Sequence, residues 1–391
     1  MIELIDDLAA FEHLRADWTD LLETSDADGL FLTWEWLFTW WKHLAGDARL
    51  FILTVRSGGK LLAIAPFAWT PARVASLLPL PSLEFLGTGT VGSDYLDIII
   101  RRGAEQEALD ALRTYLAGQS VVVGLAQLNA QHSAAAALAR ALAPHEWRQF
   151  RRAAGVCPFI RLAGLTWDSY LGSLGSDHRY NFNRRLKQAK RNFDVRFEQA
   201  RSPEECRDAL ARLIGLHNAR WQGHGGSDAF HAPAVVRFHE EVSRVALDRQ
   251  WLRLFVLWFG GEPVAALYGF RYRQTFSFYQ SGYDPRYRKH SVGLLAMGLA
   301  IKSAIDEGAG EYDLLHGDES YKFHWAKEVR ELERLELYPS DTRGWIAQQA
   351  RSASRAARQT ARRVLPVAIA DRISAAGRLG VWRGLYGAWG H

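Results

Sequence analysis

Cysteine is scarce in this chain, because only Cys157 and Cys206 occur among 391 residues. Two cysteines cannot build a disulfide framework, which predicts a reducing, cytoplasmic setting. The N-terminal segment MIELIDDLAAFEHL is acidic and lacks the basic and apolar regions of a signal peptide. No apolar run approaches the roughly 20 residues that a membrane-spanning helix needs. Secretion and membrane spanning are therefore both disfavoured.

Several signatures of catalysis and nucleotide binding are also missing. The chain has no G-x-S-x-G, P-loop, H-E-x-x-H or paired C-x-x-C, so hydrolase, NTPase and zinc-protein functions have no support. Residues 87–92 match G-x-G-x-x-G, but a strand-like segment at 95–100 follows them. A dinucleotide site requires a helix there. The polar residues at 316–324 lack the spacing of metal ligands, so we expect no metal.

Charge is distributed unevenly along the chain. Residues 343–391 contain nine Arg, no Lys and one acid, a net charge of +8, which leaves −3 for the first 342 residues of a chain whose total is +5. A slightly acidic body argues against DNA as the target. The basic tail mixes Arg and Ala with apolar residues. This composition suits either a peripheral helix on an anionic membrane surface or a helix that packs against the protein's own body.

Strands and helices alternate throughout, which predicts a mixed α/β (α+β) layered fold. A hairpin is expected at 51–69, where Ser57-Gly58-Gly59 supplies the turn. The order helix, hairpin, strand, helix, strand then recurs in the second half. We interpret the chain as an N-terminal domain at 1–150, a C-terminal catalytic domain of the same architecture at 151–340, and a basic amphipathic helical tail at 341–391.

The segment from Trp251 to Trp325 carries the strongest chemical signal. It predicts strands at 251–259 and 263–280, a basic turn, a helix at 292–307 and a strand at 311–315. A basic turn that leads into a helix can bind phosphate, because the free N–H groups and the positive end of the helix dipole face the anion. The candidate residues are Arg286, Arg288, Lys289, His290, Ser291, Val292, Gly293 and Leu294.

A set of short segments within residues 165–338 is distinctive. They are Gly261–Ala266, Tyr279–Pro285, the turn ending at Gly293, Tyr312-Asp313 before Gly317, Tyr321-Lys322 with Trp325 and, upstream, His217, Arg220-Trp221, Gly225-Gly226 and Phe230. This set resembles the catalytic domain of GNAT-type acyltransferases. The similarity is to the double-domain branch, which includes the cellulose-biosynthesis-associated acetyltransferase-like proteins and the Fem-type aminoacyltransferases. It implies two tandem GNAT-like domains, each with a central, mostly antiparallel sheet flanked by helices.

The resemblance also implies a co-substrate and a division of roles. Acetyl-CoA or another acyl-CoA would be the donor, with its pantetheine arm paired to the strand that carries Tyr279 and Ser281. A backbone N–H there can stabilise an oxyanion. The acceptor would be a small molecule or glycan precursor, bound near Trp221, Tyr283 and Asp313.

The polar cluster after the strand at 311–315 holds the candidate catalytic groups. An attacking amine or hydroxyl must lose a proton, and Asp318 and Glu319 are equal candidates for the base. Tyr321 or Lys322 can protonate the leaving thiolate or bind an acidic acceptor. The alternative interpretation of this cluster is an ordinary polar loop.

Two further functions remain open at this point. The basic helix at 178–192 is consistent with a solvated face or with Fem-like transfer from aminoacyl-tRNA. The turn at 288–293 keeps only one of the two glycines of the usual pyrophosphate signature, Arg/Gln-x-x-Gly-x-Gly. A non-catalytic scaffold in polysaccharide assembly would explain that loss.

Overall fold

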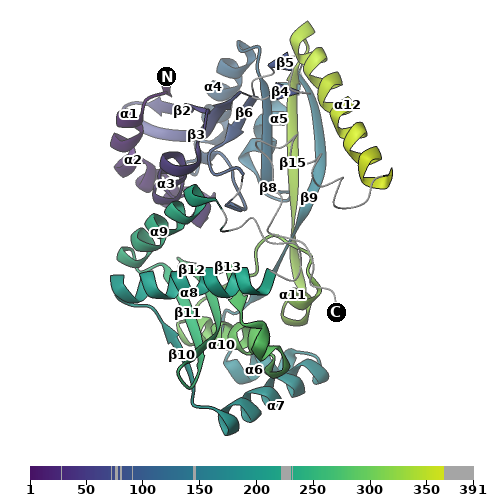
Figure 1. The fold of residues 1–391 in the computed structure, drawn as a ribbon. Helices are drawn as coiled ribbons and strands as arrows, with labels where there is room; N and C mark the ends of the chain where they lie inside the picture. The colour runs from purple at the N-terminus through teal and green to yellow at the C-terminus, as the bar shows by residue number, and fades with distance from the viewer. Residues whose placement is uncertain are drawn as a thin grey trace. The chain divides into compact units, whose positions relative to one another are not determined.

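The computed structural model describes residues 1–364 apart from 28, 72, 75–77, 80–81, 90, 144–146, 222–229 and 231. The chain divides into two compact units. Of the described residues, unit 1 combines Met1–Ala154 with 331–364, and unit 2 is Gly155–Arg330. In each unit, helices flank a sheet whose strands are mostly antiparallel (Figure 1). This confirms the predicted fold class.

Unit 1 is built on strands in the order β1-β2-β3-β6-β8-β15, with β7 paired to β3. The strands are β1 (Ile2–Ile5), β2 (Arg49–Ser57), β3 (Lys60–Thr70), β6 (Ser82–Phe85), β7 (Ile99–Ile100), β8 (Val122–Asn129) and β15 (Glu328–Pro339), with β4 (Arg73–Val74) and β5 (Leu78–Pro79) as a separate pair. The helices are α1 (Leu8–His13), α2 (Arg15–Glu23), η1 (Leu30–Leu32), α3 (Trp34–Leu44), α4 (Glu105–Ala117), α5 (Ala134–Leu142) and α12 (Thr342–Val364).

The predicted hairpin is present as β2 and β3. Gly58 and Gly59 form its turn with φ values of 56° and 79°. Both values lie in the left-handed region that a tight two-residue hairpin turn needs and that glycine adopts without strain. The glycine pair therefore sets the register of this half of the sheet.

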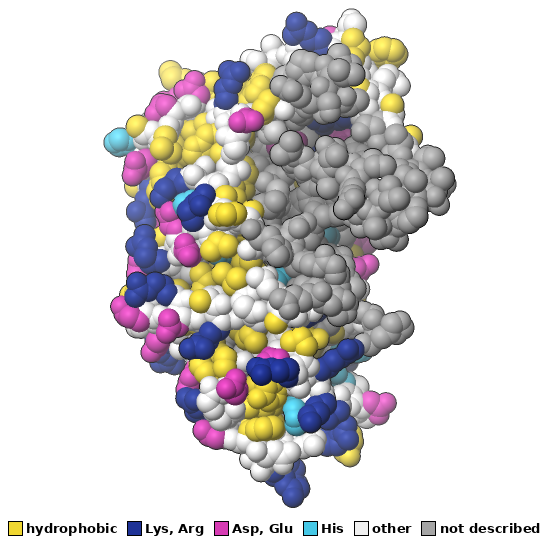
Figure 2. All heavy atoms as spheres, in the orientation of Figure 1, with side chains coloured by type: hydrophobic (Ala, Val, Ile, Leu, Met, Phe, Trp, Pro, Cys, Tyr) yellow, Lys and Arg dark blue, Asp and Glu magenta, His cyan; other side chains and the backbone are white. Residues whose placement is uncertain are grey.

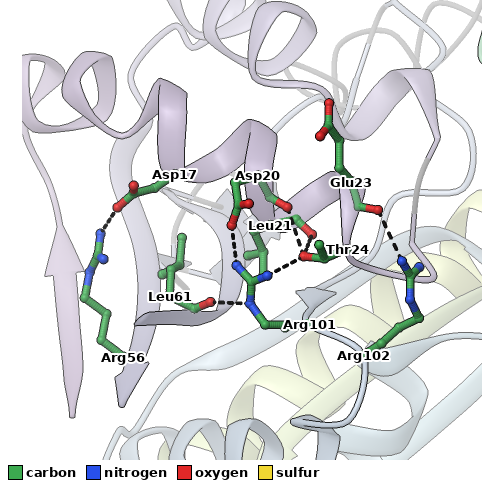
Figure 3. A network of polar contacts seen from close by, with 9 residues as sticks. All are labelled: Asp17, Asp20, Leu21, Glu23, Thr24, Arg56, Leu61, Arg101 and Arg102. Carbon is green, nitrogen blue, oxygen red and sulfur yellow. Dashed lines mark hydrogen bonds and ion pairs between the residues drawn. The ribbon is translucent and has the colours of Figure 1, made fainter. Parts of the chain in front are cut away.

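Arg101 ties three segments of unit 1 together (Figure 3). Its side chain is 10% exposed and pairs with Asp20. It also donates hydrogen bonds to the Leu61 carbonyl at 3.0 Å and to the Thr24 hydroxyl at 2.7 Å. A guanidinium has five N–H donors in a fixed plane. It can therefore link α2 and β3 to its own segment directly after β7.

Unit 2 is built on strands in the order β9-β14-β13-β12-β11-β10. The strands are β9 (Trp147–Arg161), β10 (Val195–Gln199), β11 (Leu252–Phe259), β12 (Glu262–Tyr272), β13 (Thr275–Tyr283) and β14 (Glu311–Asp313). The helices are α6 (Trp167–Ser173), α7 (Ser176–Asn192), α8 (Pro203–Trp221), α9 (Pro233–Asp248), η4 (Pro285–His290), α10 (Val292–Asp306) and α11 (Ser320–Trp325). The pair β13–β14 is parallel, and the other pairs described in this unit are antiparallel.

Some predicted elements have different bounds in the structure. The single strand expected at 263–280 is two strands, because Arg273 takes a left-handed conformation with φ of 53° and turns the chain. The strand expected at 311–315 ends at Asp313, whose carboxylate accepts the Leu315 N–H. Only Ile99 and Ile100 of the segment 95–100 form a strand, and no helix follows the glycine-rich loop directly.

Two glycines allow helices to pack closely on unit 2. A Cβ at Gly298 would lie 2.2 Å from Phe182, so α10 and α7 meet at this point. A Cβ at Gly282 would lie 2.4 Å from the His217 nitrogen, so the backbone of α8 rests directly on β13. The second contact brings the C-terminal end of α8 to the end of β13.

The beginning of the basic tail packs against unit 1. Ala347 of α12 is buried with Val122 and Tyr338. The preceding residues Trp345 and Ile346 are 51% and 38% exposed. Residues 365–391, which complete the predicted amphipathic tail, lie outside the described part of the chain.

Candidate functional site

Strands β13 and β14 diverge in unit 2. Their parallel pairing ends at Ser277 and Asp313, whereas β13 continues to Tyr283. Just beyond this point the register with β12 shifts, so that Tyr268 pairs with Gln280 and Gly269 with Phe278, which leaves Tyr279 as a bulge. A bulge bends a strand and increases its twist. It therefore accounts for the departure of β13 from β14.

The free part of β13 carries three of the predicted site residues, Tyr279, Ser281 and Tyr283, and two residues of α8 contact it. His217 contacts the Ser281 carbonyl through Nδ1 at 3.1 Å. Because a carbonyl only accepts, Nδ1 carries the proton. The Arg220 guanidinium lies 5.1 Å from the centre of the Tyr283 ring and hydrogen-bonds to that side chain. Both α8 residues are buried.

His217 and Arg220 were part of the family resemblance but were not among the predicted site residues. They lie three positions apart, on the buried side of a helix that is otherwise mixed in character. Ionisable residues are rarely buried without a role or a partner. Their spacing on the apolar face of α8 was the signal that the sequence contained.

Glu319, Tyr321 and Lys322 bring a second polar group to the site. The Glu319 side chain is 8% exposed, and its Oε2 lies 3.1 Å from Lys322 Nζ. The two groups form an ion pair, and Oε2 accepts no hydrogen bond within the described residues. Lys322 instead donates to the carbonyls of Leu315 and His316 at 3.1 and 2.8 Å.

Electrostatics connect this group to α8. Burial raises the pKa of Tyr321 well above its usual range, the Glu319 carboxylate raises it further, and Arg220 opposes the rise. Burial lowers the pKa of Arg220, while Tyr283, Tyr321 and Glu319 oppose that shift. Such mutual effects on the pKa arise between neighbouring charged and titratable groups. The structure thus brings Glu319 and Tyr321 to Arg220 and Tyr283.

Other predicted residues lie elsewhere or have different surroundings. Asp318 is exposed. Asp313 is buried and pairs with Arg330 at 3.3 Å, so its carboxylate braces the end of β14. Trp221 ends α8, and its side chain lies outside the described residues, as do Gly225 and Gly226.

The basic turn forms η4 and leads into α10. Ser291 has φ of 55° and ψ of 42°, and its side chain does not cap the helix. The first helical bond runs from the Leu295 N–H to the Ser291 carbonyl. The N–H groups of Val292, Gly293 and Leu294 precede it and have no carbonyl four residues earlier within the helix. The turn therefore offers these N–H groups to an anion.

The charges around this turn are arranged by two neighbouring contacts. Arg286 pairs with Asp284 at 2.7 Å, which lowers the pKa of that carboxyl group, and so Arg286 is directed to the protein itself. Arg185 of α7 donates to the Lys289 carbonyl at 2.9 Å. Burial and the charges of Lys289 and Arg185 lower the pKa of His290. Arg288 and Lys289 are exposed beside the helix N-terminus.

Two features of the described residues bear on other functions. No group of three or more His, Cys, Asp or Glu side chains in the described part of the chain is placed to bind a metal ion. Among the helices that the structure describes, none combines the length and apolar character that crossing a bilayer requires.

Residues 176–323 match the family model of the acetyltransferase (GNAT) domain. The fold is similar to that of FemX, with a TM-score of 0.59, 10% identity and coverage of 82% of this chain and 95% of FemX. It is also similar to the C-terminal domain of a putative lysylphosphatidylglycerol synthetase from Agrobacterium fabrum, with a TM-score of 0.53, 10% identity and coverage of 97% and 100%. For L-PGS from Bacillus licheniformis the TM-score is 0.52 and the identity 15%, with coverage of 87% and 96%. Sequence comparison with curated proteins finds no match.

The matched domain identifies an acyltransferase. Residues 176–323 form a GNAT acetyltransferase domain, and the fold of the chain is similar to that of FemX and of the lysylphosphatidylglycerol synthetase domain. The resemblance drawn from the sequence is confirmed at this level. The identities to the solved structures are low, so those similarities concern the fold.

Proposed function

We propose that this protein transfers an acyl group, most simply acetyl, from acyl-CoA to an amine or hydroxyl of a small-molecule or glycan-precursor acceptor. The supporting observation is the buried Glu319 oxygen without a hydrogen-bond donor, close to Arg220 and the free end of β13. Lys322 supplies a positive charge 3.1 Å from this oxygen, but the oxygen accepts no hydrogen bond and keeps that capacity for a ligand. An N–H or O–H of the acceptor would satisfy it.

The donor fits the same strand, whose free end leads directly into η4 and α10. Its phosphates would lie against the N–H groups at 292–294, with Arg288, Lys289 and His290 supplying positive charge. The pantetheine arm would run along the edge of β13 that β14 leaves open, past Tyr279 and Ser281. The thioester would then lie beside the open edge of β13.

Glu319 is the proposed general base, and the exposed Asp318 is not needed. The acceptor nitrogen or oxygen attacks the thioester carbonyl, a C–N or C–O bond forms and the C–S bond breaks. The acceptor proton passes to Glu319 and then to the departing thiolate. Because its pKa is raised, Tyr321 keeps its proton and serves as a hydrogen-bond donor to the sulfur. Lys322 positions the loop through the Leu315 and His316 carbonyls.

Direct transfer without a covalent enzyme intermediate is supported by the state of the cysteines. Cys157 and Cys206 are both buried. Burial raises the pKa of the Cys206 thiol to about 11. A thiol must ionise to act as a nucleophile. Neither side chain therefore has the exposed, electropositive setting of a catalytic cysteine.

Transfer from aminoacyl-tRNA is the second candidate. Lys187, Lys190 and Arg191 are exposed on α7, and Arg185 joins that helix to the basic turn. Dark-blue Lys and Arg side chains are prominent at the lower end of the molecule in Figure 2, where Figure 1 shows α7. Such a surface suits the phosphates of a nucleic acid. A scaffold in polysaccharide assembly would require neither donor.

Calorimetric titration distinguishes these functions. We expect saturable binding of acetyl-CoA, together with release of the CoA thiol when amines and amino sugars are supplied. Binding of aminoacyl-tRNA in place of acetyl-CoA would favour the second candidate. If the protein binds neither acetyl-CoA nor aminoacyl-tRNA, both proposed donors are refuted. A scaffold role would then remain.

We also propose that α12 allows peripheral contact with an anionic membrane, from an otherwise cytoplasmic protein. Trp345 and Ile346 are exposed on a helix whose sequence, residues 342–364, contains Arg but no Asp or Glu. Apolar side chains beside Arg are the composition that anionic lipid surfaces attract.

A further inference from the structure

The backbone of Ser281 is held by side chains on both of its polar groups. Its N–H donates to Gln280 Oε1 at 3.0 Å, and its carbonyl accepts from His217 Nδ1 at 3.1 Å. In an antiparallel pair, successive residues alternate between bonding to the partner strand with both groups and turning both groups away. Ser281 therefore belongs to the set that faces away from β12, toward the side where β14 has ended.

The edge exposed by the departure of β14 needs hydrogen-bond partners. A backbone N–H in a partly buried position is nearly always paired with some acceptor. At Ser281 the acceptor comes from the adjacent residue, because the Gln280 amide oxygen bends back onto the strand. That oxygen is a neutral sp² carbonyl, and a thioester carbonyl presents the same kind of acceptor.

We infer that Gln280 stands in for the acyl carbonyl of the donor. In the free protein the Gln280 amide oxygen accepts the hydrogen bond of the Ser281 N–H. It gives up this hydrogen bond when the acyl donor binds. The inference rests on the proposed function, since it assigns a partner to one atom of the donor. It adds a residue that controls donor affinity and identifies the N–H that receives the carbonyl oxygen.

The replacement of the Gln280 oxygen by the carbonyl oxygen of the donor becomes more favourable as the reaction proceeds. During transfer the carbonyl oxygen gains negative charge, and a charged acceptor bonds to an N–H more strongly than a neutral amide oxygen does. The N–H is thus held less tightly by Gln280 than by the oxygen of the transition state. His217 holds the Ser281 carbonyl meanwhile, so that Ser281 keeps its position when the glutamine moves.

Two substitutions of Gln280 test this role, because they should change the affinity for acetyl-CoA in opposite directions. Gln280→Leu removes the competing oxygen at nearly constant size, so acetyl-CoA should bind about two- to tenfold more tightly, the usual worth of one hydrogen bond. Gln280→Glu keeps an oxygen and adds charge, so acetyl-CoA should bind more weakly by at least a similar factor. Free CoA has no acyl carbonyl, and its affinity should change little in Gln280→Leu.

The measurement is calorimetric titration of acetyl-CoA and CoA into each full-length variant. Gln274→Leu, at an exposed glutamine in the turn between β12 and β13, is the matched control. Thermal unfolding establishes that each variant is folded. The informative quantity is the ratio of the acetyl-CoA affinity to the CoA affinity.

Each result decides the inference. A higher ratio in Gln280→Leu and a lower one in Gln280→Glu would support it. A ratio unchanged or lowered in Gln280→Leu, with CoA still bound, would refute it while leaving the proposed donor intact. Absence of CoA binding by the unaltered protein would refute the proposed donor and this inference together.

Discussion

Replacing Gly293 with Asp separates donor binding from folding. Gly293 lies in the first turn of α10, and a Cβ there would meet Tyr283 at 3.7 Å, an ordinary contact. A side chain therefore fits. An acidic residue in the first turn of a helix is stabilising by about 0.3–1 kcal/mol, because it faces the positive end of the dipole. We expect Gly293→Asp to fold at least as stably as the unaltered protein.

The effect on the donor should be large and of opposite sign. With an effective dielectric constant of about 20, two like charges about 6 Å apart repel each other by roughly 3 kcal/mol. That energy corresponds to about 100-fold in Kd. Gly293→Asn has the same size without the charge. The Asp variant should therefore bind acetyl-CoA about 100-fold more weakly than the Asn variant.

Titration calorimetry at two salt concentrations measures this difference. Salt screens charges at a partly exposed site, so the gap between the Asp and Asn variants should narrow as the salt concentration rises. Urea unfolding of both variants provides the measure of folding. Equal donor affinities in two folded variants would show that the N-terminus of α10 does not bind the phosphates.

Three further results are expected. Glu319→Gln should lower turnover by about 10²–10⁴ without loss of acetyl-CoA affinity, the usual worth of a general base, whereas Asp318→Asn should change it little; full activity of Glu319→Gln would place the base elsewhere. Burial lowers the pKa of His239 to about 3, so its stabilising contribution is complete above pH 6.5 and decreases as the pH falls toward 3. The loss is about 2 kcal/mol by pH 5, and His239→Phe should remove that part of the pH dependence in urea unfolding; an unchanged slope would contradict the assignment. Exchanging Trp345 and Ile346 for Gln should reduce co-sedimentation with anionic vesicles but not with neutral ones, and negligible pelleting of the unaltered protein would refute membrane contact.

The sequence determined those parts of the fold whose causes are local. Gly58 and Gly59 stand between two β-rich segments, and such a pair favours the tight turn of a hairpin because glycine adopts positive φ without strain. Ser202 and Glu205 cap α8 through reciprocal bonds with each other's backbone, as their spacing predicts. The basic turn before α10 was predicted for the same reason. Such signals depend on neighbours within a few residues.

Only the tertiary structure decided which polar residues meet. The bulge at Tyr279 appears in the pairing with β12, and the departure from β14 in the pairing with a strand that begins at Glu311. Asp318 and Glu319 were equal candidates in the sequence, yet one is exposed and the other is buried with an unsatisfied oxygen. Strand pairing between distant parts of the sequence depends on the packed chain, and so does burial. Residue type and spacing alone could therefore not distinguish these carboxylates.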